Sequence, residues 1–402
     1  MAKVDFAWEL GAGTGHVTTL LPLASAMRAR GHDVRFLLRD PGAGADLEGA
    51  AEIPREGAPV WSGTAVYPNP LNLGEILVNF GYHDPGPVRQ LVDAWRERLQ
   101  ASRAVIANVA PAAHLAARTL GIPSFEISQG FHVPPQTLPS PPFRDWEPAP
   151  RARLEAADAR VLNAMNSALA AYGAQPIATL GELFAGRAML LTYPELDIYP
   201  ERGASDYYGI TDSGEGKAAP AWPAGDGARV FAYLYHYYRG LEPLLLALAG
   251  LKLPALVFCR GIEPELKEKL SGRSVHFSEE PMSVSRLLPQ CGLVVCHASH
   301  QMTAQALLAG KPMLLVPTQL EQFLITRRVV RYGAGLGIAP EVPNADFAGA
   351  LTQLVESAGY AARASEFAQR YAGHDHAAAL ATMVQRCEAA FGDTFARGDR
   401  IG

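Results

Sequence analysis

A buried strand followed at once by a cluster of glycines constrains the fold of this chain most. Residues 4–8 are apolar and β-prone, three glycines fall within 11–15, and apolar residues recur at helical spacing over 17–27. A Gly-His pair at 31–32 ends this helix, and 33–38 predicts a second buried strand. A strand, a helix and a strand in this order form a βαβ unit, which requires a parallel sheet.

The same pattern recurs in both halves of the chain. Further units follow at 105–109, 111–120 and 124–127, and again at 229–235, 241–251 and 255–259. Residues 212–227 are rich in Gly, Pro and Ala and lack apolar periodicity, which predicts a linker. We therefore predict an α/β chain of two tandem Rossmann-like, doubly wound parallel-sheet domains that face a cleft. The N-terminal domain takes 1–211 and the C-terminal domain 228–385, and a tail at 386–402 is expected to pack back on the N-terminal domain.

Composition excludes several classes of function. The 402 residues carry 35 Lys and Arg against 40 Asp and Glu, a net charge of −5, so no nucleic acid partner is predicted. The most apolar stretch, 241–258, is interrupted by charges and prolines, which predicts no transmembrane segment. Four cysteines without a CxxC pair predict buried free thiols. Together with an N-terminus unlike a signal peptide, they predict a cytoplasmic location.

The first glycine turn carries a candidate catalytic residue, His16. A histidine between strand and helix points toward the cleft, and its ordinary pKa near 6.5 suits a general base. The alternative is a histidine that only caps the helix or packs on the loop. As a dinucleotide fingerprint the turn fails, because the third glycine position holds His16, although Asp40 lies where a ribose-binding acid would.

A proline-rich segment at 133–150 includes Phe143 and Trp146 and cannot be a helix or a central strand. It is either a mobile loop or the wall of an acceptor pocket.

A second strand-to-helix turn lies at 297–302, between a strand at 293–296 and a helix predicted over 303–308. The positive end of that helix dipole favours a phosphate. His297 and His300 are expected to donate hydrogen bonds to phosphate oxygens. Two histidines three residues apart also suggest a metal, but no third ligand has a matching spacing, so no metal site is predicted.

Both turns resemble those of nucleotide-sugar-dependent glycosyltransferases of the GT-B fold, the macrolide and plant-type family. The residues that match at the first turn are Gly15, His16, Val17, Pro22, Leu23, Ala24, Gly31, His32 and Val34. Those that match the donor-nucleotide signature are His297, Thr303, Ala306, Leu307, Gly310, Pro312, Pro317, Gln322, Gly333 and Gly335. The resemblance implies that His16 is the base that activates the acceptor. Asn108 stands where the family places the acidic partner of that histidine.

The departures from the family pattern fall on the donor site. Ala298 and Ser299 replace paired glycines, and Gln301 and Met302 stand where the family has Gly or Asn and then Ser or Thr. Gln305 replaces a ribose-binding glutamate, and Glu321 replaces the aspartate before Gln322. The turn after the first strand of the second domain, residues 235–238, reads Tyr-His-Tyr-Tyr instead of small residues. Donor choice or donor affinity is therefore expected to differ.

The sequence thus predicts an inverting, metal-independent glycosyltransferase with a UDP-sugar or dTDP-sugar as co-substrate, no other cofactor, and a small-molecule or lipid acceptor. The predicted donor-binding residues are Gly13, Thr14, Gly15, His236, His297, Ala298, Ser299, His300, Gln301, Met302, Thr303, Gln305, Glu321 and Gln322. The main alternative is a non-catalytic relative that binds a partner. A nucleotide-sugar epimerase and an NAD-linked enzyme are lesser ones, and a homodimer is left open.

Overall fold

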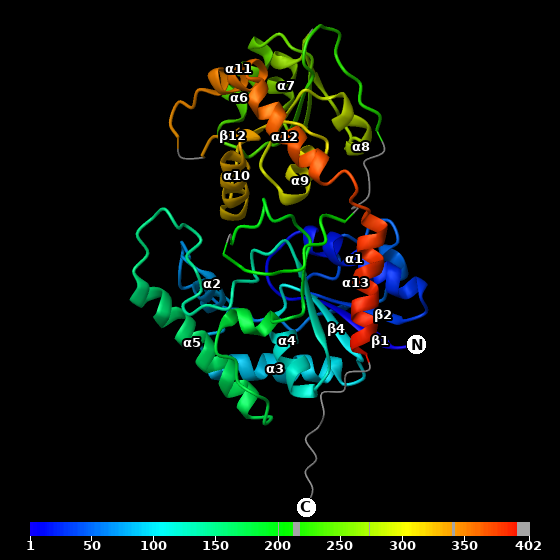
Figure 1. Ribbon diagram of the computed structural model, residues 1–402, viewed down its shortest axis with the longest axis vertical. Helices are drawn as coiled ribbons and strands as arrows, with labels where there is room; N and C mark the ends of the chain where they lie inside the picture. Colours follow the sequence, from blue (N-terminus) through cyan, green and yellow to red (C-terminus); the bar gives the residue numbers. More distant parts are fainter. Residues whose placement is uncertain (200, 212–217, 273, 340–341, 392–402) are drawn as a thin grey trace, which may run out of the picture. The chain divides into compact units, whose positions relative to one another are not determined.

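The structure is a computed structural model that describes residues 1–199, 201–211, 218–272, 274–339 and 342–391 (Figure 1). It divides into two compact units, which are described separately. The first holds the described residues of Met1–Tyr193, Tyr199–Ser213 and Asp375–Gly402. The second holds those of Pro194–Ile198 and Gly214–His374.

The first unit is built on a parallel sheet, six-stranded within the described residues, with the order β3-β2-β1-β4-β5-β6. Its strands are β1 (Lys3–Trp8), β2 (Asp33–Leu38), β3 (Arg55–Gly57), β4 (Ala104–Asn108), β5 (Ser124–Ser128) and β6 (Ala188–Leu190). The order reverses beside β1, which is the doubly wound topology, and ligands bind such sheets at the carboxyl ends of the strands around the reversal. In this unit those ends belong to β1 and β4, where Trp8 pairs with Asn108.

Helices cover both faces of this sheet. They are α1 (Gly15–Ala29), α2 (Leu73–Asn79), α3 (Pro85–Leu99), α4 (Pro111–Leu120), α5 (Arg151–Ala170) and α13 (His376–Ala390), with short 3₁₀ turns at Ala50–Glu52 and Leu180–Phe184. The helix α4 contacts α3 and α5, whereas α13, from the far end of the chain, lies beside α1 (Figure 1). Proline at the first position and a left-handed Gly121 (φ 70°) fix both ends of α4.

The second unit repeats this plan with the strand order β12-β11-β10-β7-β8-β9. Its strands are β7 (Val230–Tyr235), β8 (Ala255–Arg260), β9 (Val275–Phe277), β10 (Leu293–Cys296), β11 (Met313–Leu315) and β12 (Gly335–Gly337). Its helices are α6 (Leu241–Gly250), α7 (Pro264–Leu270), α8 (Val284–Leu287), α9 (His300–Leu308), α10 (Leu320–Tyr332), α11 (Phe347–Glu356) and α12 (Ala358–Arg370), with a 3₁₀ turn at Leu288–Gln290. Here β7 and β10 meet at the reversal of the order.

The short segment Pro194–Ile198 belongs to the second unit although both of its neighbours in the chain belong to the first. Glu195 forms an ion pair with Arg370 and accepts a hydrogen bond of 2.7 Å from the Tyr371 hydroxyl. Arg328 donates to the backbone carbonyls of Pro194 and Glu195, at 3.1 Å each. These contacts attach the segment to α10 and α12.

The doubly wound parallel sheet predicted for each half is confirmed, and so are the four buried free cysteines. The helix predicted to begin at residue 303 instead begins at His300, because Ser299 is extended and already serves as its N-cap residue. No helix in the described ranges combines the length and the apolar character that a membrane crossing requires.

The chain returns to the first unit at Asp375, earlier than the predicted tail at 386–402. The reason is packing: α13 buries Met383, Val384 and Cys387 in the core of the first unit, so the whole helix belongs there. Residues 212–217 of the predicted linker and 392–402 of the predicted tail lie outside the described residues.

Candidate functional site

His16 lies in the first turn of α1, directly after the glycine turn that follows β1. Gly11 has a φ of +90°, and a Cβ atom built there would lie 2.6 Å from His16 Nε2. A side chain at position 11 would therefore both strain the backbone and displace the imidazole. The predicted cradle residues Gly13, Thr14 and Gly15 are exposed beside it.

Two strands hold the His16 ring in place. From β1, the Trp8 indole stacks on the imidazole with centroids 4.6 Å apart and an interplanar angle of 17°. From β4, Asn108 Oδ1 lies 2.6 Å from His16 Nδ1. Asn108 Nδ2 donates to the Ile127 carbonyl at 2.5 Å, and since a carbonyl only accepts, the amide oxygen must face His16. The proton of a neutral His16 therefore sits on Nδ1, and Nε2 keeps its lone pair.

Burial lowers the pKa of His16 from its usual value of 6.5, and the hydrogen bond to Asn108 opposes this shift only in part. The imidazole is therefore neutral at pH 7. A neutral ring with a lone pair on Nε2 is what a general base requires. Asn108 orients the ring as a carboxylate would, but it adds no negative charge to stabilise an imidazolium.

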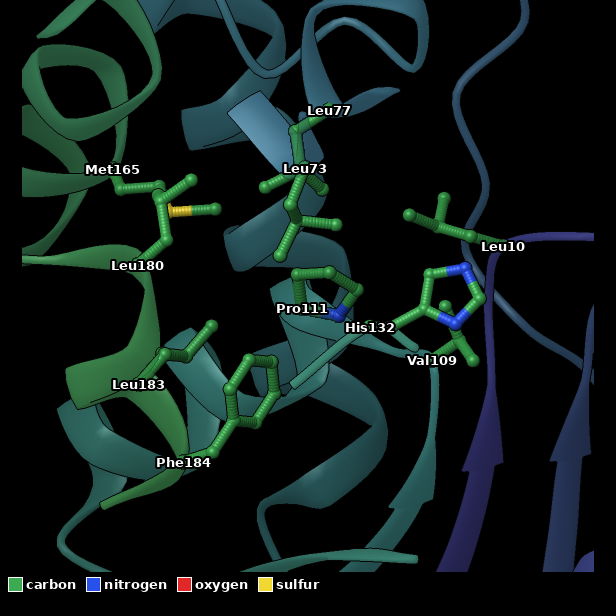
Figure 2. Close-up of a pocket in the computed structure, with 10 residues that line it drawn as sticks. All are labelled: Leu10, Leu73, Leu77, Val109, Pro111, His132, Met165, Leu180, Leu183 and Phe184. Atoms are coloured by element: carbon green, nitrogen blue, oxygen red, sulfur yellow. The ribbon is translucent and has the colours of Figure 1, made fainter. Parts of the chain in front are cut away.

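A second histidine, His132, lies at the wall of an apolar cavity (Figure 2). Burial, and then repulsion from His16, lowers the pKa of His132 to about 3, so it too is neutral. All other residues that line the cavity are apolar: Leu10, Leu73, Leu77, Val109, Pro111, Met165, Leu180, Leu183 and Phe184. The cavity volume is about 10 Å³, close to what one water molecule needs.

The proline-rich segment 133–150 has neither helix nor strand, as predicted. Phe143 is buried and stacks on Phe131, with centroids 4.8 Å apart and an interplanar angle of 13°, whereas Trp146 is 37% exposed. Since His132 precedes the segment directly, the segment begins at the apolar cavity. Its role as the wall of an acceptor pocket stays a prediction.

In the second unit, the turn after β10 keeps a backbone that suits glycine. Ala298 has a φ of +58°, in the left-handed region that costs an alanine about 1–2 kcal/mol. Its side chain and those of Met302 and Thr303 are buried, whereas Ser299, Gln301 and Gln305 are partly exposed. The side chains that a ligand reaches at this turn are therefore the polar ones.

The expectation that His297 donates to a phosphate is not supported by its contacts. Its Nδ1 lies 2.6 Å from the Val316 carbonyl and must carry the proton, while its Nε2 accepts the backbone N–H of Tyr235 at 2.8 Å. Both nitrogens of the neutral ring are thus used inside the domain. Tyr235 also stacks on the imidazole, with centroids 4.7 Å apart and an angle of 8°, and Tyr237 stacks on Tyr235 in turn.

His300 supplies no positive charge at neutral pH either. Burial lowers its pKa to about 4, although the carboxyl group of Asp197 opposes the shift. Burial also lowers the pKa of His297. The favourable charge for an anion at this turn is therefore the N-terminal end of the α9 dipole and not an imidazolium.

The remaining predicted donor residues lie on neighbouring elements of the same unit. Gln322 is buried in the first turn of α10, and its Oε1 accepts from the N–H and the hydroxyl of Thr318, at 2.8 and 2.9 Å. A ligand contact by Gln322 would therefore use its amide nitrogen. Burial raises the pKa of Glu321. His236 is exposed after β7, and its Nδ1 lies 3.0 Å from the Arg260 carbonyl.

The structure thus gathers the predicted residues into two sets. Residues 13–16 lie at the carboxyl end of β1 in the first unit, and the others lie at the carboxyl ends of β7, β10 and β11 in the second. In the part of the chain that the structure describes, no group of three or more His, Cys, Asp or Glu residues is placed to hold a metal ion.

Sequence reasoning missed Trp8 and His132. Trp8 is the last residue of β1. An aromatic residue at the end of a strand, just before a glycine turn, could have indicated its place in the site. His132 adjoins the proline-rich segment, but its nearness to His16 depends on chain pairing that sequence spacing does not reveal.

Comparisons with known proteins agree with this arrangement. Residues 273–390 match the family model described as "Erythromycin biosynthesis protein CIII-like, C-terminal domain". The zeaxanthin glucosyltransferase of Pseudescherichia vulneris is 22% identical over 377 residues, which is 85% of this chain and 87% of that protein.

Solved structures show the same fold. The calicheamicin glycosyltransferase CalG4 superposes with a TM-score of 0.69 at 18% identity, covering 98% of both chains. The glycosyltransferase SsfS6 of Streptomyces sp. SF2575, complexed with thymidine diphosphate, gives a TM-score of 0.59 at 19% identity, covering 97% of this chain and 99% of that one. Motifs, fold and family match agree, and the chain is a glycosyltransferase of the GT-B fold.

Proposed function

We propose that this protein transfers a sugar from a nucleoside-diphosphate sugar, UDP or dTDP, to the hydroxyl group of an apolar acceptor, with inversion and without a metal. The single observation that carries the proposal is the His16 site. A neutral imidazole, fixed by Trp8 and Asn108, keeps a lone pair on Nε2.

In the proposed step, His16 Nε2 takes the proton of the acceptor hydroxyl as its oxygen attacks the anomeric carbon of the donor. The bond from that carbon to the diphosphate oxygen breaks, and its electron pair leaves with the nucleoside diphosphate. One direct displacement inverts the anomeric centre. The N-terminus of α9 offers backbone N–H groups and a positive dipole end to the leaving diphosphate, a task that otherwise falls to a metal ion.

The acceptor class is inferred from the cavity beside His132. Its lining is apolar apart from His132, whose imidazole is neutral, so a charged acceptor would lose hydration without a counter-charge. Because the cavity volume is only about 10 Å³, binding requires side chains to move apart. Met165 is suited to this because methionine is flexible. That the curated relative is named for glucosylating zeaxanthin, an apolar diol, is consistent with this class.

The test is a transfer assay with UDP- and dTDP-sugars and hydrophobic alcohols, on the natural chain and on His16→Ala. Loss of general-base help is expected to lower kcat by about 100- to 10,000-fold. His276→Ala is the matched control, because His276 is exposed on β9 of the second unit. An His16→Ala protein that folds and transfers at the natural rate would remove His16 from this role.

One observation favours a second candidate, a binding protein without catalysis. His297 has no N–H left for a phosphate, and Ala298 stands where glycine suits the backbone. Calorimetric titration with UDP, dTDP and GDP separates the two candidates. Saturable binding supports the transferase, and no binding of any of the three supports the second candidate.

A further inference from the structure

Val109, the residue after β4, has a backbone conformation that must be held by its surroundings. Its φ is +55°, in the left-handed region, and a β-branched residue there is an outlier. Val109 is buried and follows Asn108, the residue that holds His16. Its strain therefore lies next to the proposed catalytic base.

Both backbone polar groups of Val109 are hydrogen-bonded. Its N–H donates to Glu126 Oε1 at 2.8 Å, and its carbonyl accepts the N–H of Leu10 at 2.9 Å. Glu126 lies on β5 and is 1% exposed, so its carboxyl group was taken out of water to make this contact. Buried carboxyl groups are costly unless they are fully bonded.

The second oxygen of Glu126 is also satisfied. Glu126 Oε2 lies 2.9 Å from His114 Nε2, and His114 Nδ1 lies 2.9 Å from the Ser124 hydroxyl. The rings of His114 and Phe184 pack edge to face, with centroids 5.2 Å apart at 90°. Phe184 in turn lines the apolar cavity. Glu126 is thus hydrogen-bonded to His114, and His114 packs against Phe184 in the cavity wall.

The bond from Val109 N–H fixes more than Val109. That N–H belongs to the peptide group between Asn108 and Val109, whose plane sets the ψ angle of Asn108 as well as the φ angle of Val109. A change in this plane moves the Asn108 amide away from His16 or from the Ile127 carbonyl.

We propose that Glu126 is a positioning residue for sugar transfer: it holds the Asn108–Val109 peptide in its strained orientation, and so keeps the Asn108 amide on His16 Nδ1. This inference rests on the proposed function, in which His16 is the base. Glu126 touches neither donor nor acceptor in this account. Its effect passes through one peptide group and one side chain.

The variants that test this follow from the hydrogen bonds. Glu126→Ala removes the acceptor of Val109 N–H, and the peptide is then expected to relax toward negative φ. Glu126→Gln keeps an amide oxygen for that N–H, and its NH₂ can donate to His114 Nε2 when His114 donates from Nδ1 to Ser124. In Val109→Gly, residue 109 no longer needs the hydrogen bond to Glu126 to keep its positive φ, because glycine adopts positive φ at no steric cost.

The first readout is the tautomer of His16 in the full chain, followed by ¹⁵N NMR of histidine-labelled protein, with the signals assigned from His16→Gln. We expect Nδ1–H in the natural chain and in Glu126→Gln, a mixture of tautomers in Glu126→Ala, and recovery of Nδ1–H in Val109→Gly/Glu126→Ala. Asp158→Ala is the matched control. Asp158 is also a buried acid of the first unit that accepts a backbone N–H, from Ser140 at 2.6 Å, but it is not bonded to the Asn108–Val109 peptide.

The second readout is the rate of sugar transfer. Glu126→Ala is expected to lower kcat by roughly 10- to 100-fold, the loss typical of partners that orient a functional histidine, with the KM for the donor unchanged. The loss should be much smaller when Glu126→Ala is made in the V109G background. A folded Glu126→Ala protein with natural His16 signals, or a loss that V109G does not reduce, would overturn the inference. If the natural chain transfers no sugar, the proposed function fails while the NMR readout still decides the positioning role.

Discussion

At the scale of single residues, Asn108 satisfies two neighbours with opposite requirements. His16 Nδ1–H requires an acceptor, and the Ile127 carbonyl requires a donor at 2.5 Å. An amide provides both, whereas an aspartate would set a carboxylate oxygen against that carbonyl. The neighbour on β5 thus explains why an asparagine suits position 108 better than an acid does.

Asn108→Asp is therefore expected to have two separable effects. The carboxylate stabilises the imidazolium and therefore raises the pKa of His16. Because the base acts only when unprotonated, the acid limb of kcat/KM should lie at higher pH in Asn108→Asp than in the natural chain. The Ile127 carbonyl loses its donor, which should lower the free energy of unfolding by about 1–3 kcal/mol.

The matched control is Asn166→Asp. Asn166 also donates to a carbonyl, that of Ile177 at 2.9 Å, but the amide bonded to His16 Nδ1 is that of Asn108. Its substitution should reduce thermal stability without moving the acid limb. An acid limb that stays in place in Asn108→Asp would contradict the contact between Asn108 and His16.

The residues of the site were predictable from sequence only where the chemistry is local. His16 follows a glycine turn, and that position alone predicts it as a candidate base. The occupied nitrogens of His297 were not predictable, because one partner is a backbone N–H on β7 and the other a carbonyl after β11, both distant in the chain. Glu126 gave no signal, because its importance comes from the φ of Val109.

At the scale of elements, the buried strands that were predicted, and the helices predicted after them, agree with the structure within one or two residues, because their apolar runs are continuous; the exception is α9, which begins three residues before the predicted position 303. Three-residue strands such as β3, β6 and β12 were missed, because so short a run carries no periodicity. The return of α13 to the first unit depends on which core its apolar face fits, and sequence alone does not give that.

A charged cluster attaches α13 to the first unit and makes its packing sensitive to acid. Glu388 accepts from Arg30 at 2.7 and 2.8 Å, and its Oε1 lies 2.9 Å from His32 Nε2. The bonds from Arg30 and His32 lower the pKa of Glu388 from 4.5 to about 2. A carboxyl group with a depressed pKa stabilises the fold above its unfolded pKa, and this contribution is lost as the pH falls from about 4.5 to about 2.

Glu388→Gln should therefore lower the thermal midpoint at pH 7, and the difference from the natural chain should shrink between pH 4.5 and pH 2. Differential scanning fluorimetry across this range measures it. Glu52→Gln is the control, because Glu52 pairs with Arg28 on the same unit with both side chains about half exposed. A Glu388→Gln difference that persists at pH 2 would contradict the assignment of the pKa shift to this cluster.

At the scale of the whole molecule, each unit has a hydrophobic core of its own. The first core combines β1, β2, β4 and α1 with residues of α13, and the second combines β7, β8 and β10 with α6 and α11. The predicted donor residues of the second unit and the His16 site therefore sit on separately packed scaffolds. A ligand that binds one scaffold should stabilise that scaffold first.

A nucleoside diphosphate without a sugar is expected to act on the second unit. At a concentration about 100 times its Kd, it should add about 2.7 kcal/mol to the stability of the unit that binds it. Hydrogen exchange with UDP or dTDP should then slow at the backbone amides of 297–305 and 320–323, which lie at the start of α9 and α10.

Exchange over 376–390 in α13 serves as the internal control, because that helix packs in the core of the first unit. Protection of the amides at 11–17 without protection at 297–305 would place the diphosphate on the glycine turn before His16. It would contradict the proposal that the second unit binds the donor.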